Sequence, residues 1–416
     1  MGRDAETLLS GVDVKRIVKI IIALIMAGVV VGFYAAPVMA ATSFVQWIEE
    51  FYPEAKKEGI SRATWDMAFS GVTEPDPKVL KKASYQPEFT TEIWDYLDGR
   101  VNPLSIARGQ EMARRYQGTL DAVESRFGVR RWVILAIWSM ESNYGAILEK
   151  TKRLHYVPQA LATLAYGDPK RRKFARKQLI AALQILQSGD ITPEKMTGSW
   201  AGALGHTQFI PTSYLAYGVD MDGNGRRDIW GSIPDALATA ANLLKENGWR
   251  TRHTWGYEVI IPKDGEGFKD ETMTLAQWQK LGYKRTGGRS FPRPSDKAVL
   301  KLLAGPEGPA FLMMKNFYVL KRYNNADAYA LAVGLLADRM AGYGRLAQSW
   351  PRPPGSLSVD EKFELQERLQ QRGYYDGKID GYLGGGTRKA IRSFQAQAGL
   401  EVDGKPNQNL LKALRR

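Results

Sequence analysis

The feature that most constrains the fold is an unbroken apolar segment at residues 132–138, which reads WVILAIW. A surface helix keeps one polar face, whereas a helix that is apolar on every side must be enclosed by other elements. The segment therefore predicts a buried central helix in a domain large enough to surround it. This helix is expected to continue through Glu141, with Gly145 as its C-cap.

Helical patterns dominate the surrounding sequence. Asn102 and Pro103 form a typical N-cap and first turn, and predict an amphipathic helix over residues 103–127. Further helices are expected at residues 179–188 before Gly189, at 235–247 and at 326–340. Residues 257–261 and 311–314 instead have the composition of short strands between turns. The pattern indicates a mainly helical domain with a small β-containing insertion.

The C-terminal part is predicted to form a separate unit. Residues 350–356 read WPRPPGS, a stiff and polar segment that cannot continue a helix. Beyond it, residues 357–416 contain three short apolar faces with helical spacing, separated by Asp-Gly turns. We expect a domain at 41–350, a linker at 351–356 and a three-helix domain at 357–416.

The N-terminal residues predict export. Lys15, Arg16 and Lys19 precede the uncharged residues 20–41, and small residues surround Ala40. This order is typical of a secretory signal over residues 1–40 that is cleaved after Ala40. The alternative is a retained membrane anchor, because the apolar run is about long enough to cross a bilayer. Both interpretations place the folded part in the periplasm, and only the second gives it a membrane contact.

Composition narrows the chemistry. The chain contains no cysteine, which excludes thiol catalysis and Cys-ligated zinc. Lys and Arg total 58 against 44 Asp and Glu, a net charge of +14 that favours a polyanionic partner. No nucleic-acid recognition motif accompanies this charge, so we expect no nucleic-acid partner.

Glu141 is the candidate catalytic residue. It follows the buried helix directly, where an ionised carboxylate is costly. Burial and the partial negative charge of a helix C-terminus both raise the pKa of a carboxyl group. A carboxyl group that keeps its proton near neutral pH suits a general acid at a glycosidic oxygen. The structural alternative is a glutamate that emerges into solvent.

Other residues supply polar and aromatic groups typical of a sugar cleft. Residues 199–211 read SWAGALGHTQFIP, in which small residues allow close approach. Ser199 and Gln208 can hydrogen-bond to sugar substituents. Tyr323, Asn324 and Tyr329 are candidate stacking platforms. Each of them also has an ordinary structural explanation.

Three motifs in order carry a family resemblance: ESNYG after an apolar helix, GALGHTQFIPTSY, and FYVLKRYNNADAYALAV. Together they resemble the membrane-bound lytic murein transglycosylase B family over about residues 44–350. The resemblance implies a lysozyme-like helical catalytic domain that cleaves the bond between N-acetylmuramic acid and N-acetylglucosamine in peptidoglycan. Glu141 would act first as acid and then as base on the muramic C6 hydroxyl, which yields a 1,6-anhydro end without a protein nucleophile or a cofactor.

Matching motifs place five residues in the glycan cleft: Tyr96, Ser199, Gln208, Tyr323 and Tyr329. One departure is visible at Asn242-Leu243, where family members often carry a tyrosine after the asparagine. A stacking contact is therefore expected to be missing there.

An acidic loop is a candidate metal site. Residues 220–228 read DMDGNGRRD and place oxygen side chains at the first, third, fifth and ninth positions of an EF-hand-like loop, with glycine at the sixth. The twelfth position is Gly231 instead of the usual glutamate, and the resemblance implies Asp235 as the closing acid. The hypothesis is a structural calcium held by Asp220, Asp222, Asn224, Asp228 and Asp235. The alternative is a turn that binds no ion.

The C-terminal unit resembles the peptidoglycan-binding type 1 domain, through LQERL, GYYDG and TRKAIRSFQ. Its implied role is to hold the enzyme on peptidoglycan, which raises the local substrate concentration. Two alternatives to a transglycosylase stay open. A hydrolase of the same bond requires a second carboxylate across the cleft, and a non-catalytic scaffold would bind the wall without cleaving it.

Overall fold

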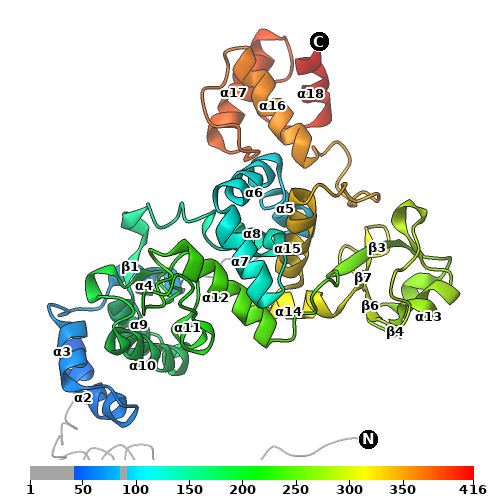
Figure 1. The fold of residues 1–416 in the computed structure, drawn as a ribbon. Helices are drawn as coiled ribbons and strands as arrows, with labels where there is room; N and C mark the ends of the chain where they lie inside the picture. Colours follow the sequence, from blue (N-terminus) through cyan, green and yellow to red (C-terminus); the bar gives the residue numbers. More distant parts are fainter. Residues whose placement is uncertain (1–41, 85–90) are drawn as a thin grey trace, which may run out of the picture.

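The computed structural model describes residues 42–84 and 91–416. The predicted signal segment lies outside the described residues. Within the described ranges, no helix combines the length and hydropathy needed to span a bilayer. The predicted mainly helical architecture with small sheets is confirmed (Figure 1).

The first helices and the central helices form the larger body of the protein. In chain order they are α2 (Phe44–Lys57), α3 (Arg62–Phe69), α4 (Pro77–Ser84), α5 (Ile93–Asp98), α6 (Pro103–Arg115), α7 (Gln117–Phe127), α8 (Arg131–Ser142), α9 (Val157–Gly167), α10 (Arg172–Ser188), α11 (Pro211–Tyr217), α12 (Ile233–Glu246), α14 (Lys315–Tyr323) and α15 (Asp327–Met340). The two short strands β1 (His155–Tyr156) and β2 (Thr197–Gly198) pair antiparallel and join the start of α9 to the loop after α10.

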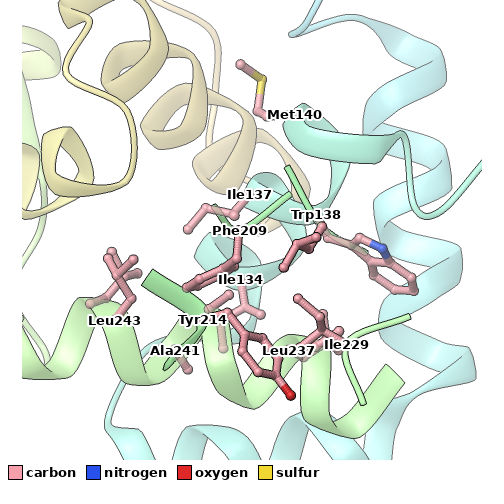
Figure 2. Close-up of a cluster of buried hydrophobic side chains, with 14 of the residues drawn as sticks. Ile134, Ile137, Trp138, Met140, Phe209, Tyr214, Ile229, Leu237, Ala241 and Leu243 are labelled. Atoms are coloured by element: carbon pink, nitrogen blue, oxygen red, sulfur yellow. The ribbon is translucent and has the colours of Figure 1, made fainter. Parts of the chain in front are cut away.

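Helix α8 is the predicted buried central helix. All of residues 133–140 are buried, and α8 packs against α15, α6, α12 and α7. Figure 2 shows Ile134, Ile137 and Phe209 within the same apolar cluster as Leu237 of α12. Enclosure on several sides explains why this helix has no polar face.

Two predicted helix boundaries were wrong. The helix expected over residues 103–127 is divided into α6 and α7 at Tyr116, whose ring packs edge-on against Trp138 with centroids 5.6 Å apart. Helix α8 ends at Ser142, and its C-cap is Asn143 and not Gly145, because Asn143 already has the left-handed backbone, with φ 51°. Asparagine tolerates this conformation better than most residues, so it can end a helix as glycine does.

The β-containing insertion lies between α12 and α14 and has its own core (Figure 1). Its sheet has the order β4-β6-β7-β3-β5, and every neighbouring pair is antiparallel. The elements are β3 (Gly256–Ile260), β4 (Thr272–Thr274), α13 (Leu275–Lys280), β5 (Lys284–Arg285), β6 (Lys297–Leu302) and β7 (Ala310–Met313). Strands β3 and β7 are the two predicted strands, whereas the other strands were not anticipated.

The C-terminal unit contains the expected helices α16 (Val359–Gln371), α17 (Gly385–Gln397) and α18 (Gln408–Arg415), around a separate apolar core. Figure 1 shows it beside α5 and α6. Asp98 at the end of α5 accepts hydrogen bonds from Arg352 of the linker, at 2.6 and 2.9 Å, and from Lys362 of α16, at 2.7 Å. These ion pairs tie the linker and the C-terminal unit to α5.

Candidate active site

The turn after α8 places Glu141 against the loop at residues 199–211. Asn143, Tyr144 and Gly145 all have positive φ, so the chain reverses sharply after the helix. The Ser142 hydroxyl donates to the carbonyl oxygen of His206 at 2.6 Å and accepts from the Gly145 amide at 2.9 Å. The loop is thereby attached directly to the end of the helix that carries Glu141.

Glu141 has an unusual electrostatic environment. The Tyr329 hydroxyl donates to Glu141 Oε1 at 2.6 Å. Burial raises the pKa of Glu141 to about 7, although the Tyr329 hydrogen bond and the charge of Arg100 act in the opposite direction. Glu141 is partly exposed as a whole residue, whereas its carboxyl group is strongly desolvated. A carboxyl group that titrates near neutral pH can donate a proton and then accept one.

Two tyrosines of the third motif stand beside this carboxylate. The rings of Tyr323 and Tyr329 are stacked, with centroids 6.4 Å apart and an interplanar angle of 12°. Tyr323 donates its hydroxyl proton to the carbonyl oxygen of Thr207 at 2.6 Å. Burial holds the pKa of both phenols well above the usual value, so each keeps its proton as a donor.

Tyr96 also belongs to this cluster. Its helix, α5, packs against α15, which carries Tyr329. Burial raises the pKa of Tyr96, and Glu141 adds to that rise through its charge. Arg100 lies with its guanidinium 5.8 Å from the centre of the Tyr96 ring. Its charge lowers the pKa of Glu141, so the fold brings Arg100 to the site as well.

Arg100 is a residue of the site that was not predicted from the sequence. A signal was present, because Arg100 lies only four residues after Tyr96 in the sequence. Among the described residues, Arg100 is the one charged group that contributes to the pKa of Glu141.

The predicted polar residues of the loop have structural partners of their own. Ser199 Oγ accepts from the amides of Ala201 and Ala203, at 3.3 and 3.0 Å. Gln208 has a left-handed backbone, with φ 50°. Its side-chain amide nitrogen donates to the carbonyl oxygen of Gly205 at 2.8 Å. These bonds shape the loop, and the remaining donor and acceptor capacity of each side chain is available to a ligand.

The other predicted positions differ in their surroundings. Asn324 is exposed at the C-cap of α14, next to Tyr323. Leu243, the departure from the family pattern, is buried in the main core (Figure 2). Its side chain therefore packs inside the domain and offers no stacking surface to a sugar in the cleft.

The acidic loop brings together three of the predicted ligands. Carboxylate oxygens of Asp220, Asp222 and Asp235 lie within 4.8 Å of one another. Asp235 is fully buried and accepts from the backbone amides of Met221, Asp222 and Asp228, at 2.8, 3.3 and 2.8 Å. Oxygen donors of this kind suit calcium. Three carboxylates this close together repel one another, and a cation bound between them would offset that repulsion.

The structure does not bring Asp228 into this group. Its carboxylate instead accepts from the backbone amides of Trp230 and Gly231, both at 2.8 Å. Asn224 lies in the loop, and its side-chain oxygen accepts from the Arg226 amide at 2.9 Å. Both residues therefore shape the turn.

Two protein families match this chain, one over the helical body and one over the C-terminal unit. Residues 43–338 match the model of the transglycosylase SLT domain, and residues 360–414 match that of the putative peptidoglycan binding domain. Membrane-bound lytic murein transglycosylase B of Escherichia coli is 29% identical over 58% of this chain, and the alignment spans 65% of that protein.

Solved structures are similar as well. SltB3 of Pseudomonas aeruginosa, in complex with NAG-anhNAM-pentapeptide, is 44% identical with a TM-score of 0.71, over 90% of this chain and 100% of that one. Lytic transglycosylase Slt35 of Escherichia coli, in complex with calcium, has a TM-score of 0.60 at 23% identity, over 71% of this chain and 92% of that one, and shows the shared fold.

Proposed function

The chain belongs to the transglycosylase SLT domain family, and we propose on that basis that it is a lytic transglycosylase of peptidoglycan. The predicted family and the lysozyme-like helical fold are confirmed by the family match and by the similarity to SltB3. The observation that carries the proposal within this molecule is the environment of Glu141. Its carboxyl group is strongly desolvated, receives a hydrogen bond from Tyr329 and titrates near neutral pH.

In the proposed reaction, protonated Glu141 donates its proton to the oxygen that links N-acetylmuramic acid to N-acetylglucosamine. The bond from muramic C1 to this oxygen breaks, and the N-acetylglucosamine side leaves as an alcohol. The resulting carboxylate then accepts the proton of the muramic C6 hydroxyl while that oxygen bonds to C1. Glu141 regains its proton, and the product is a 1,6-anhydro end with no water added. One carboxyl group that serves in turn as acid and base requires a pKa close to the working pH.

The surroundings of Glu141 favour this reaction over hydrolysis. A retaining or inverting hydrolase uses two carboxyl groups across the cleft. Among the residues that the structure describes, no second carboxylate contributes to the pKa of Glu141. A scaffold without activity is less consistent with a carboxyl group of raised pKa beside a tyrosine donor, because such perturbed groups gather at functional sites.

The neighbouring residues have distinct proposed roles. Tyr329 orients Glu141 and stabilises its ionised form through the 2.6 Å hydrogen bond. Tyr96, Tyr323 and Asn324 bind the glycan strand, and Ser199 and Gln208 contribute hydrogen bonds from the loop. Arg100 limits the rise in the pKa of Glu141. The C-terminal unit, by its family match, holds the enzyme on peptidoglycan.

Two further features belong to this proposal. We place the enzyme in the periplasm, because its substrate lies there and residues 1–40 have the pattern of an export signal. The acidic loop would hold a calcium ion through Asp220, Asp222 and Asp235, with no part in bond cleavage. Calcium would neutralise the repulsion among these carboxylates and brace the loop next to residues 199–211.

The identity of the products tests the proposed function. Residues 41–416 would be incubated with purified sacculi, and the released muropeptides would be identified by mass spectrometry. We expect 1,6-anhydromuramic ends from the wild type and none from Glu141→Gln. Reducing ends that carry an added water would identify a hydrolase. Binding to sacculi without release by either protein would identify a scaffold.

A further inference from the structure

A large cavity lies apart from Glu141, where three parts of the molecule meet. Its volume is about 1350 Å³, and Glu141 does not line it. One wall consists of α5, the start of α6 and the end of α15, and a second belongs to the β-containing insertion around β3 and β5. The linker and the first turn of α16 complete it. Figure 1 shows α5, α6 and α15 next to the C-terminal unit.

Arginine side chains dominate the charge of this cavity. Across residues 42–84 and 91–416, no carboxylate lies within ion-pair distance of six of the arginines that line it: Arg130, Arg252, Arg285, Arg289, Arg293 and Arg339. Their remaining contacts are weak. Arg285, for example, lies over the ring of Tyr257 at 4.6 Å and donates to the Ser290 carbonyl oxygen at 3.3 Å.

The acidic residues around the cavity already have partners. Asp98 binds Arg352 and Lys362, and Asp360 pairs with Arg345. Glu258 accepts from the amides of Ala347 and Gln348, at 2.9 and 2.8 Å. Two other acids complete this set: Asp338 accepts from Trp255 Nε1 at 2.9 Å, and Glu361 accepts in the capping box of α16. None of these five acids lies within ion-pair distance of the six arginines, although the charge of Arg130 lowers the pKa of Asp338.

Three of these six guanidinium groups, those of Arg285, Arg293 and Arg339, are partly buried without an acidic partner. Burial lowers the pKa of Arg339, and repulsion from the charge of Arg345 adds a smaller effect in the same direction. Elsewhere the chain pairs many of its arginines, as in Arg62 with Glu49 and Arg227 with Asp190. Guanidinium groups bind carboxylates bidentately, so a ligand with carboxylates would relieve the repulsion.

The cavity and the glycan cleft share helices. Tyr96 belongs to α5, whose Leu97 and Asp98 line the cavity. Tyr329 belongs to α15, and Asp338 and Arg339 of the same helix line the cavity. Nine helical residues span about 14 Å, the rise from Tyr329 to Asp338. A side branch of a glycan bound at Glu141 can therefore reach the arginines.

We propose that this arginine-lined cavity binds the carboxylates of the stem peptides that branch from the glycan strand. The inference rests on the proposed function. The N-acetylated sugars of the strand are neutral once the lactyl group is amide-linked to a peptide, so the negative charge of the substrate lies on its peptides. Recognition of those carboxylates would make the enzyme prefer strands that carry peptides over strands from which they have been removed.

A pair of substrates tests the proposal. Purified glycan strands would be used with their stem peptides, and after removal of the peptides by an amidase. Arg285→Gln with Arg293→Gln is expected to raise KM for peptide-bearing strands about tenfold, with kcat unchanged, because charge-assisted hydrogen bonds are lost. KM for denuded strands should not change, which also shows that the variant is folded. Arg114→Gln is the matched control, since Arg114 is exposed on α6 and does not line the cavity.

Binding separates this proposal from the proposed function. In a Glu141→Gln background, the affinity for peptide-bearing strands should fall by the same factor when Arg285 and Arg293 are replaced, while that for denuded strands is retained. Arg293→Lys should keep part of the affinity, because lysine keeps the charge but loses the bidentate geometry. Equal losses on both substrates, or none on either, would overturn the proposal. Failure of the wild type to cleave either substrate would instead contradict the transglycosylase activity.

Discussion

Glu141 and Asp235 are both acidic side chains held inside the helical body, and the chain surrounds them with different numbers of donors. Glu141 receives one hydrogen bond, from Tyr329. Asp235 receives three from backbone amides, and its neighbours Asp220 and Asp222 bring further negative charge close to it. Burial raises the pKa of both groups, and at Asp235 the backbone donors oppose that rise.

The difference shows how burial of a carboxyl group serves two purposes. With few donors the group keeps its proton near neutral pH, which favours proton transfer. With several backbone donors the group organises the loop that donates to it, and the cost of its charge is offset by hydrogen bonds or by a cation. Glu141 is therefore expected to matter for activity, and Asp235 for stability.

Glu141→Gln gives the largest expected effect. Loss of the proton donor should lower kcat about 10³-fold or more. The folded-state pKa of about 7 lies above the ordinary value of 4.5, so the stability that the protonated group contributes is lost as pH rises through 7. Glutamine stays neutral, so the free energy of unfolding should rise, by on the order of 2 kcal/mol at pH 8. Turnover of sacculi and chemical denaturation measure the two effects.

Glu149→Gln is the control, because Glu149 is exposed on the segment after α8. Neither activity nor stability should change in it. A Glu141→Gln variant with substantial activity would remove Glu141 from the mechanism.

Asp235→Ala should reduce stability strongly and activity only slightly, the opposite of Glu141→Gln. Three backbone amides lose their acceptor, and the free energy of unfolding should fall by about 3 kcal/mol. Activity per folded molecule should fall far less than in Glu141→Gln. Denaturant titration measures the stability, and Asp222→Ala, at an exposed position, should cost much less. Equal costs for the two variants would indicate that burial of Asp235 is not what distinguishes it.

Tyr329→Phe tests the single donor to Glu141. In the wild type, activity should decline as pH rises above about 7, because the general acid loses its proton. Removal of the Tyr329 hydroxyl raises the pKa of Glu141 further, so this decline should move to higher pH. We also expect kcat to fall about tenfold, because Glu141 loses its orienting contact.

Tyr323→Phe is the matched variant. Its hydroxyl donates to Thr207 and not to Glu141. The pH at which kcat declines should therefore be the same as in the wild type. A shift in both variants would mean that the site responds to general loss of packing.

Calcium gives the smallest expected effect. Millimolar calcium should stabilise the wild type by about 1 kcal/mol, or ~2–4 °C in Tm, if it binds the acidic loop. Asp222→Asn should abolish this gain without a comparable loss of activity, and thermal melts with calcium or a chelator measure it. A calcium effect that persists in Asp222→Asn would place the ion elsewhere.

Part of this molecule was predictable from local sequence. The apolar run at residues 132–138 predicted the buried helix, and its continuation to Glu141 placed a carboxyl group in a buried setting. The proline-rich linker separated the C-terminal unit, and glycine ended α10 at the predicted position, with φ 76° at Gly189. These features depend on neighbours a few residues apart, where spacing and backbone preference act directly.

Other features depended on contacts between distant segments. The hydrogen bond from Tyr329 to Glu141 joins residues 188 positions apart, and no periodicity encodes such a pairing. Helix α6 ends at Tyr116, whose ring packs against Trp138 of α8, whereas the local pattern favoured one continuous helix. The arginines of the cavity are drawn from the loop before α8, from the insertion and from α15.

The sequence alone thus determined the buried helix that ends in Glu141, because hydrophobic spacing is a local property, and it nominated the candidate residues around that helix. Only the tertiary structure decided the number of donors at each buried carboxyl group, one at Glu141 and three at Asp235. It also decided which arginines have no acidic partner. The physical reason is that a pKa depends on every charge, donor and apolar group packed around the atom, and packing is set by the whole fold.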